Sequence, residues 1–413
     1  MSLAAPLRHL RRFRRDESGN FIMLFGISIV PILGLTGAAV DYSRASKARA
    51  ELNAAIDSAA LMAARDASKL TDAELTARIN NWIKGNLSPD TAAKFGSASI
   101  TIDRVSRTVN ITGHIDVDTS VARVIGQNSI AVSSANQSSW GTKKIELALA
   151  LDNTGSMAGS KLTALKTATR DLLKIMQDAV TEPDQVKVSM IPFHTQVRMP
   201  TSYKNANWLR WDVAKKNSKP AVYPQKGSWE GCISDRDSPY DASDALVVDT
   251  NVTTKYPAAF CQYTLATSVP LTNDWAALNS AVDTMIASGN TNVTMGVAWG
   301  WASLSDTVPL AEGKAANTPR LTKYMIVLTD GDNTENRFTG DGNIIDGRTA
   351  QACANAKAAG IQIYTIRVIN GDANLLRNCA SSPGMYYDVQ NASQLSPVFK
   401  KIASEIAAVR LTM

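Results

Sequence analysis

The chain has 413 residues, of which 45% are hydrophobic and 19% charged; this is enough apolar sequence for a sizeable core and too much for a disordered or fibrous protein. The formal net charge is +6, but the rest of the chain is almost neutral, because five of those charges come from Arg8, Arg11, Arg12, Arg14 and Arg15. This balance argues against a nucleic-acid-binding protein, and three histidines leave few candidates for a catalytic triad or a multi-histidine zinc site.

An apolar stretch follows the arginines, and residues 20–40 contain no charge. Roughly 20 residues at ~1.5 Å each match a hydrocarbon core of ~30 Å, so we expect a transmembrane helix at 20–40. The positive-inside rule then makes residues 1–19 a basic cytoplasmic tail and places the rest outside the membrane. A cleaved signal peptide and the core helix of a soluble protein are the alternatives.

The helical pattern continues beyond the span, because residues 38–70 contain neither Gly nor Pro. We therefore predict a helical stalk over 41–70. Leu52, Ile56, Ala59 and Ala63 share one helical stripe. That stripe could pack on the chain's own next domain, or it could associate with pilin-like partners or with a second copy of the chain.

A small α+β module is predicted over residues 71–142. An amphipathic helix at 72–87 has the apolar stripe Leu75, Ile79, Trp82 and Ile83. Period-two alternation then predicts three half-buried strands, at 97–104, 108–118 and 129–139. We find no chemistry in this module.

Residues 143–413 alternate apolar strands with helices, which indicates an α/β fold with a doubly wound, mostly parallel sheet covered on both faces. The pattern is interrupted at 198–270 by a segment too long for an ordinary connection, which we interpret as an insertion with its own local order. The expected strands are 144–152, 185–193, 324–330 and 361–369, and the expected helices are 161–180, 295–303, 347–359 and 392–409.

The insertion is rich in aromatic and basic residues. Trp208, Trp211 and Trp229 could contact a glycan or an acidic partner surface, or they could pack on one another inside the insertion. Four cysteines follow the span, and an even number in an oxidising compartment favours disulfides. Proximity favours Cys232–Cys261 and Cys353–Cys379; free thiols and a four-cysteine metal site are the alternatives, although no C-x-x-C pair occurs.

Oxygen-bearing side chains follow three of the predicted elements. Asp152, Thr154 and Ser156 form D-x-T-x-S after the first strand of the α/β region, Thr291 lies in a loop before a helix, and Asp330 ends a later strand. Ligands bind where parallel strands end, and carboxylate and hydroxyl oxygens suit one hard cation, Mg²⁺ or Mn²⁺. The same residue types also cap helices and turns, which is the structural alternative.

In this order the five residues resemble the metal-ion-dependent adhesion site (MIDAS) of von Willebrand factor A domains, written D-x-S-x-S, then Thr, then a strand-end Asp in T-D-G. Thr154 stands where many A domains have Ser but keeps the oxygen. The resemblance implies a site that leaves one coordination position open for a partner's carboxylate, and that binds without catalysing a reaction.

The amino-terminal region resembles the TadE/TadG-like pilus-assembly family at residues 16–21, 37–41 and 57–61, and D-N-T-G-S-M at 152–157 is a variant found in its A domains. This resemblance implies a single-pass protein of the bacterial inner membrane with periplasmic main domains. Its implied role is in Flp (Tad) pilus assembly, with pilin-like or membrane components as partners and no nucleic acid.

Two other functions are compatible with parts of this sequence to different degrees. Catalysis finds little support, since a haloacid-dehalogenase-type phosphohydrolase needs D-x-D where Thr154 stands, and the surroundings of Ser156 lack the glycines of G-x-S-x-G. We therefore expect a protein that is not an enzyme. A metal-dependent adhesin or a cell-wall or glycan-binding surface protein is the second function, and it would use the same cation site.

Overall fold

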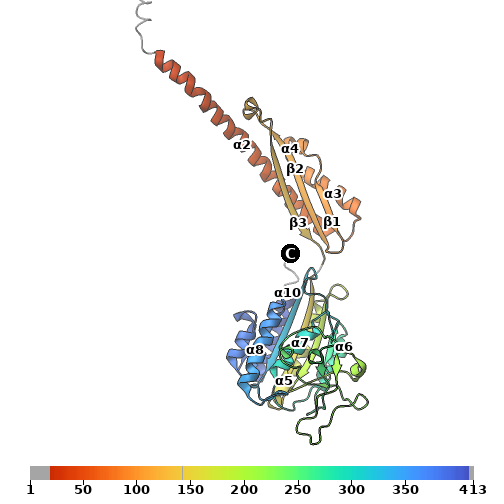
Figure 1. Ribbon diagram of the computed structural model, residues 1–413. Helices are drawn as coiled ribbons and strands as arrows, with labels where there is room; N and C mark the ends of the chain where they lie inside the picture. The colour runs from red at the N-terminus through yellow and green to blue at the C-terminus, as the bar shows by residue number, and fades with distance from the viewer. Residues whose placement is uncertain (1–18, 142, 409–413) are drawn as a thin grey trace, which may run out of the picture. The chain divides into compact units, whose positions relative to one another are not determined.

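The computed structural model describes residues 19–141 and 143–408, so the expected basic tail lies, except for Gly19, outside the described residues. The chain divides into two compact units at residues 141–142, and each is described by itself (Figure 1). The first unit contains the apolar helix and the α+β module. The second contains the α/β region.

One helix, α2, spans Gly19–Asp66 and joins the predicted span and stalk without a break. It ends four residues before the predicted end of the stalk. Its early part exposes large apolar side chains, such as Phe25 and Leu35, which are 60% and 73% exposed. Within the described residues it is the one helix long and apolar enough to cross a bilayer.

The later part of α2 packs on the module of its own unit. The predicted stripe of Leu52, Ile56, Ala59 and Ala63 is completely buried. At Gly113 the sheet comes so close to the helix that an added Cβ would lie 2.8 Å from Ile56 Cδ1. The stalk therefore serves first as the core helix of this unit (Figure 1).

The three strands that alternation predicted form an antiparallel sheet in the order β1-β2-β3; the sequence did not predict their order or direction. Its helix α3 begins with a capping box, in which Glu74 N donates to Thr71 Oγ1 and Thr71 N to Glu74 Oε2. Trp82 departs from the predicted apolar stripe: it is 38% exposed, and its indole N–H donates to Ser58 Oγ at 2.8 Å. The elements are α3 (Asp72–Gly85), α4 (Pro89–Lys94), β1 (Ser99–Asp103), β2 (Thr108–Asp118) and β3 (Ser129–Ser139).

The second unit contains an eight-stranded sheet in the order β13-β12-β11-β4-β5-β6-β8, with β10 also paired to β5. The five strands from β13 to β5 are parallel, and the short strands β6, β8 and β10 pair antiparallel, so the predicted mostly parallel sheet is confirmed. The strands are β4 (Lys144–Asp152), β5 (Val186–Phe193), β6 (Val197–Arg198), β8 (Cys232–Ile233), β10 (Val269–Thr272), β11 (Leu321–Thr329), β12 (Gln362–Val368) and β13 (Tyr386–Val389).

Helices cover both faces of this sheet. On β4, Leu147, Leu149 and Leu151 face the core built with α5, α6 and α10, whereas Ala148 and Ala150 face the core built with α7 and α8. Side chains that alternate between two apolar cores are typical of a doubly wound fold. The helices are α5 (Ser160–Asp178), α6 (Trp275–Thr284), α7 (Val293–Ser303), α8 (Gly342–Ala358), α9 (Ala373–Cys379) and α10 (Leu395–Ala408). The helices α6 and α9 and the strands β10 and β13 are additional to those predicted.

The insertion extends the core of this unit. Its residues Trp208 and Tyr256 pack against Trp299 of α7, with ring centroids 6.3 and 5.1 Å apart. Strands β6 and β8 lengthen the main sheet, and β7 (Leu209–Arg210) pairs with β9 (Tyr256–Pro257) as a separate ribbon. The predicted local order exists, but it is built on the larger fold.

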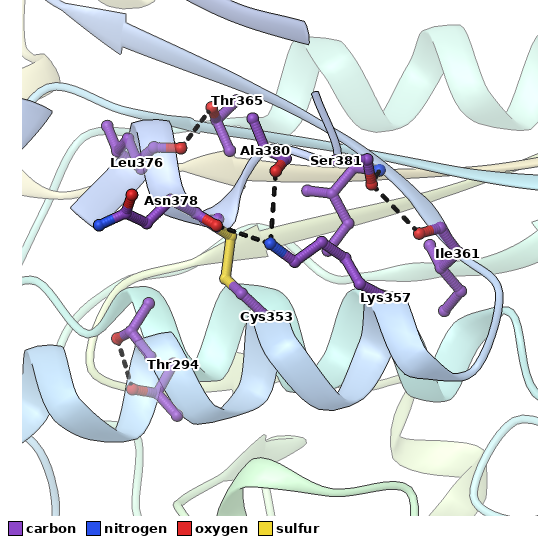
Figure 2. Close-up of a disulfide and its surroundings, with 12 residues drawn as sticks. Thr294, Cys353, Lys357, Ile361, Thr365, Leu376, Asn378, Ala380 and Ser381 are labelled. Carbon is purple, nitrogen blue, oxygen red and sulfur yellow. Dashed lines mark hydrogen bonds between the residues drawn. A yellow bond between two sulfur atoms is a disulfide. The ribbon is translucent and has the colours of Figure 1, made fainter. Parts of the chain in front are cut away.

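The cysteines are paired as proximity favoured, Cys232 with Cys261 and Cys353 with Cys379. The second bond joins α8 to the end of α9 (Figure 2). Beside it, Lys357 Nζ donates to the carbonyls of Asn378 and Ala380 at 2.6 and 3.3 Å. The disulfide and the hydrogen bonds of Lys357 thus attach the end of α9 to α8.

Replacing Cys353 and Cys379 by Ala should lower the free energy of unfolding of the second unit by about 3 kcal/mol, because the bond closes a long loop in the unfolded chain. Urea unfolding followed by tryptophan fluorescence measures this change. Mass spectrometry of unreduced peptides provides the control. Free thiols at both positions in the unaltered protein, or equal stability of the variant, would contradict the prediction.

Candidate metal centre

Two buried carboxylates meet at the carboxyl edge of the central strands. Asp152 is the last residue of β4 and Asp330 directly follows β11. These strands are parallel neighbours, with Leu151 opposite Leu328, so both ends reach the same edge. Asp152 is 0% exposed and Asp330 is 1% exposed.

Hydrogen bonds link these carboxylates to the loop after β4. Asp152 Oδ1 accepts from Thr154 N at 2.7 Å, and its Oδ2 accepts from Thr329 Oγ1 at 2.6 Å. Ser156 Oγ donates to Asp330 Oδ1 at 2.6 Å and lies 2.9 Å from Thr154 Oγ1. Four of the five residues singled out from the sequence thus form one connected group.

Thr291 brings the fifth oxygen-bearing side chain, from the loop before α7. Its N–H donates to Thr334 Oγ1, and its carbonyl accepts from Thr334 N, both at 2.9 Å. A Cβ added at Gly331 would lie 3.3 Å from Thr291 Oγ1 and 3.5 Å from Ser156 Oγ. Both hydroxyls therefore face the same place beside Gly331, and the structure brings all five residues together.

Burial makes this a costly place for negative charge. It raises the pKa of Asp152 to about 6, and the neighbouring Asp330 carboxylate acts in the same direction. The hydrogen bonds from Thr154 and Thr329 oppose this rise. A bound cation would favour the charged carboxylates, so the electrostatics of the site fit one.

Lys161 supplies a positive charge that the sequence argument missed. Its Nζ donates to Asp330 Oδ2 at 2.6 Å, and its side chain is 18% exposed. A cation in the first turn of α5 is unfavourable with respect to the helix dipole, which was an available signal that a nearby anion compensates for it. One ammonium beside two carboxylates leaves a negative balance.

The donor set indicates which kind of ion would fit. Among the described residues there is no group of three or more His, Cys, Asp or Glu side chains arranged to hold a metal. This cluster offers two carboxylates and three hydroxyls instead. Such an all-oxygen set suits Mg²⁺ or Mn²⁺ better than metals that prefer nitrogen or sulfur.

The insertion forms hydrogen bonds to two of the loops beside the site, which sequence reasoning also missed. Asp235 Oδ1 accepts from Asn292 Nδ2 at 2.8 Å, and its Oδ2 accepts from Arg337 N at 3.1 Å. One carboxylate thus joins the loop after Thr291 to the loop after Asp330. Asp235 is 2% exposed, and burial raises its pKa.

For three tryptophans of the insertion the sequence leaves surface contact and packing as alternatives, and two of them are buried. Trp208 and Trp229 are only 3% and 6% exposed, and Trp229 donates its indole N–H to Cys232 O. Trp211 is half-buried and packs edge-on against Trp229, with ring centroids 5.6 Å apart. Buried rings cannot stack on a surface glycan, so the packing interpretation accounts for them.

The role of Asp235 can be tested by Asp235→Ala. We expect it to destabilise the second unit by about 2 kcal/mol, since two buried donors lose their acceptor. Asp249→Ala is the matched control, because this insertion carboxylate is 74% exposed in its pair with Lys255 and should contribute little. Urea unfolding of both variants measures the difference; equal stabilities would contradict the prediction.

The role of Lys161 can be tested by Lys161→Met. Because the ammonium competes for an oxygen of Asp330, its removal should raise the affinity for Mn²⁺ and lower the stability of the metal-free protein. Calorimetric titration and thermal unfolding measure the two effects. Lys174→Met, which breaks the exposed pair with Asp178 on the same helix, should change neither; unaltered Mn²⁺ affinity in Lys161→Met would show that the ammonium does not compete.

Two family models match the chain. Residues 19–66 match a model described as putative Flp pilus-assembly TadE/G-like, and residues 258–401 match the von Willebrand factor type A domain. The chain thus has a TadE/G-like segment on α2 and an A domain in its second unit. The second match includes Thr291 and Asp330, whereas Asp152 lies before the insertion and joins them through the sheet.

Similar solved structures include pilus proteins. The pilus adhesin SpaC from Lactobacillus rhamnosus GG has 15% identity and a TM-score of 0.40 over 76% of this chain and 34% of SpaC, so the chain spans about a third of that protein. The vWF domain of the type V pili tip protein Mfa5 from Porphyromonas gingivalis has 12% identity and a TM-score of 0.41, over 66% of this chain and 98% of that domain. A structure of mussel byssus proximal thread matrix protein 1 with a zinc-occupied MIDAS has 14% identity and a TM-score of 0.35, over 64% and 46% of the two chains. No curated protein matches the chain.

Proposed function

We propose that this protein is a periplasmic component of Flp (Tad) pilus assembly, anchored in the bacterial inner membrane, whose A domain binds a protein partner through a divalent cation. The observation that carries the proposal is the convergence of Asp152, Thr154, Ser156, Thr291 and Asp330 in a chain that also has a TadE/G-like segment. The partner would be another pilus-assembly protein.

The cation would be Mg²⁺ or Mn²⁺, held by the two carboxylates and three hydroxyls. When bound, it supplies a Lewis-acidic position that can accept a carboxylate oxygen from the partner. The protein's own residues hold the oxygens in place. Because three of the five side chains are neutral hydroxyls, the site would leave the cation with enough positive charge to attract a carboxylate of the partner. Ser156 Oγ has Asp330 and Thr154 as its hydrogen-bond partners, an arrangement suited to a ligand, and we propose binding without catalysis.

A cavity next to the site has the character expected of a partner surface. It has a volume of about 600 Å³, and its lining includes Phe260, Tyr263, Phe338 and the cationic Lys215 and Arg337. The Tyr263 ring lies against Gly289, the residue whose carbonyl accepts from Gly155 N in the metal-binding loop. A partner that binds the cation through one carboxylate could thus place further apolar and acidic side chains of its own in this cavity.

The expected topology follows from the anchor and the cysteines. Helix α2 provides one span at its apolar beginning, and the arginines before it favour a cytoplasmic amino terminus. Two disulfides then suit an oxidising periplasm.

The cation site can be tested with Asp152→Asn. This change keeps an acceptor for Thr154 N and removes the charge, so the fold should persist while cation binding is lost. A cation bound only to the folded state adds about 2.7 kcal/mol of stability at a hundredfold excess over Kd. We expect Mg²⁺ or Mn²⁺ to raise the melting temperature of the unaltered protein and of Asp178→Asn, a control at an exposed carboxylate, but not of Asp152→Asn.

Equal shifts in the unaltered protein and Asp152→Asn would show that the cation binds elsewhere. The biological part is tested by counting surface pili in cells that carry Asp152→Asn at normal protein levels. Lost pili would support a role in assembly. Normal pili with poor attachment would favour the metal-dependent adhesin instead.

A further inference from the structure

The loop between β2 and β3, residues 119–128, lies against the apolar part of α2; we name it the hairpin tip. Figure 1 shows the two strands alongside the later part of the helix and the loop beyond them. The contact is close: a Cβ added at Gly37 would lie 2.2 Å from Val121 Cγ2. A larger residue at position 37 would displace the hairpin tip from the helix.

Asp41 fixes the hairpin tip at this level of the helix. Its Oδ1 accepts from Ser120 N at 2.8 Å, and its Oδ2 accepts from the N–H groups of Val121 and Ala122, both at 3.0 Å. Arg44 Nη1 also donates to Ser120 Oγ at 2.5 Å. Four contacts from one helical turn therefore set the height of the loop along α2.

This height coincides with the predicted edge of the membrane. The uncharged stretch ends at Val40, and about 20 residues at 1.5 Å are only just enough to cross the hydrocarbon core. Gly37 lies three residues inside that end, or about 4.5 Å along the helix. Tyr42, just beyond it, is 74% exposed, as in the aromatic belts found at membrane interfaces.

The side chains of the hairpin tip suit such a level. Val124 is 86% exposed, Arg123 is also exposed, and residues 119–128 include no acidic residue. An apolar group next to a long cation can enter the acyl boundary while the guanidinium stays among the phosphates. Exposure alone does not distinguish the hairpin tip, because Val105, in the turn at the other end of β2, is 96% exposed. Val124 differs from Val105 in lying beside the apolar part of α2.

We infer that the hairpin tip inserts into the outer interface of the bilayer, with Val124 in contact with lipid, and forms a second membrane contact beside the helix. The inference rests on the anchor in the proposed function and is independent of the cation site. Because the hydrogen bonds of Asp41 join the hairpin tip to α2, the contact between the tip and lipid would hold the whole α+β module at a fixed height above the membrane.

Site-directed spin labelling of the full chain in vesicles of phosphatidylethanolamine and phosphatidylglycerol tests this inference. The chain has four cysteines, all paired, so an introduced cysteine takes a nitroxide specifically. Three single variants are compared by collision with oxygen and with a nickel chelate: Val124→Cys in the tip, Val30→Cys within the span, and Val105→Cys as the control. The control position lies at the other end of β2 from the hairpin tip. Eleven strand residues at about 3.3 Å each put the two ends of β2 about 36 Å apart.

We expect a ratio of oxygen to nickel collisions that is highest at position 30, intermediate at 124 and lowest at 105, with the value at 124 several-fold above that at 105. If positions 124 and 105 are equally accessible to nickel while 30 is protected, the inference is wrong and the anchor stands. If position 30 is as accessible as 105, neither the anchor nor the inserted tip exists.

Discussion

The second unit depends on the cost of placing two carboxylates side by side at a buried sheet edge. Asp152 and Asp330 are brought together because β4 and β11 are parallel neighbours, and every contact around them reduces the penalty. The Ser156 hydroxyl donates to Asp330, the Thr329 hydroxyl donates to Asp152, and Lys161 provides one positive charge. This compensation is incomplete, which is the condition under which a divalent cation contributes binding energy.

The loops that carry these groups depend in turn on the insertion. Asp235 bonds to both Asn292 and the backbone of Arg337, and the buried Trp208 packs the insertion on α7. A segment that interrupts the strand–helix pattern thus stiffens the site and also lines the adjacent cavity. Partner specificity and cation binding would therefore be coupled through the same segment of the chain.

Much of this architecture could be predicted from sequence because its signals are local. Alternation in residues 108–118 and 129–139 predicted the bounds of β2 and β3, and a strand-end Asp followed by hydroxyls predicted which oxygens meet. Asp235 could not be found in this way, because its contact with Asn292 is 57 residues away in sequence. The position of Lys161 indicates a nearby anion but not which one, because Asp330 is 169 residues away. Trp82 was placed wrongly in the apolar stripe, and surface contact and packing both stayed open for Trp208 and Trp229, because aromatic residues suit both surfaces and cores and only tertiary packing decides.

In the first unit, one helix, α2, forms both the apolar stretch and the core helix of the α+β module. A single helix that leaves a bilayer can tilt and rotate, and its own sequence sets neither movement. Here the buried stripe of α2 begins at Gly37 and Asp41, inside and just beyond the apolar stretch, so the module packs against the helix where its apolar stretch ends. A module fixed at that level would turn with the helix as one body. Any partner that bound the exposed apolar face of α2 within the membrane would then also control the orientation of the α+β module outside it.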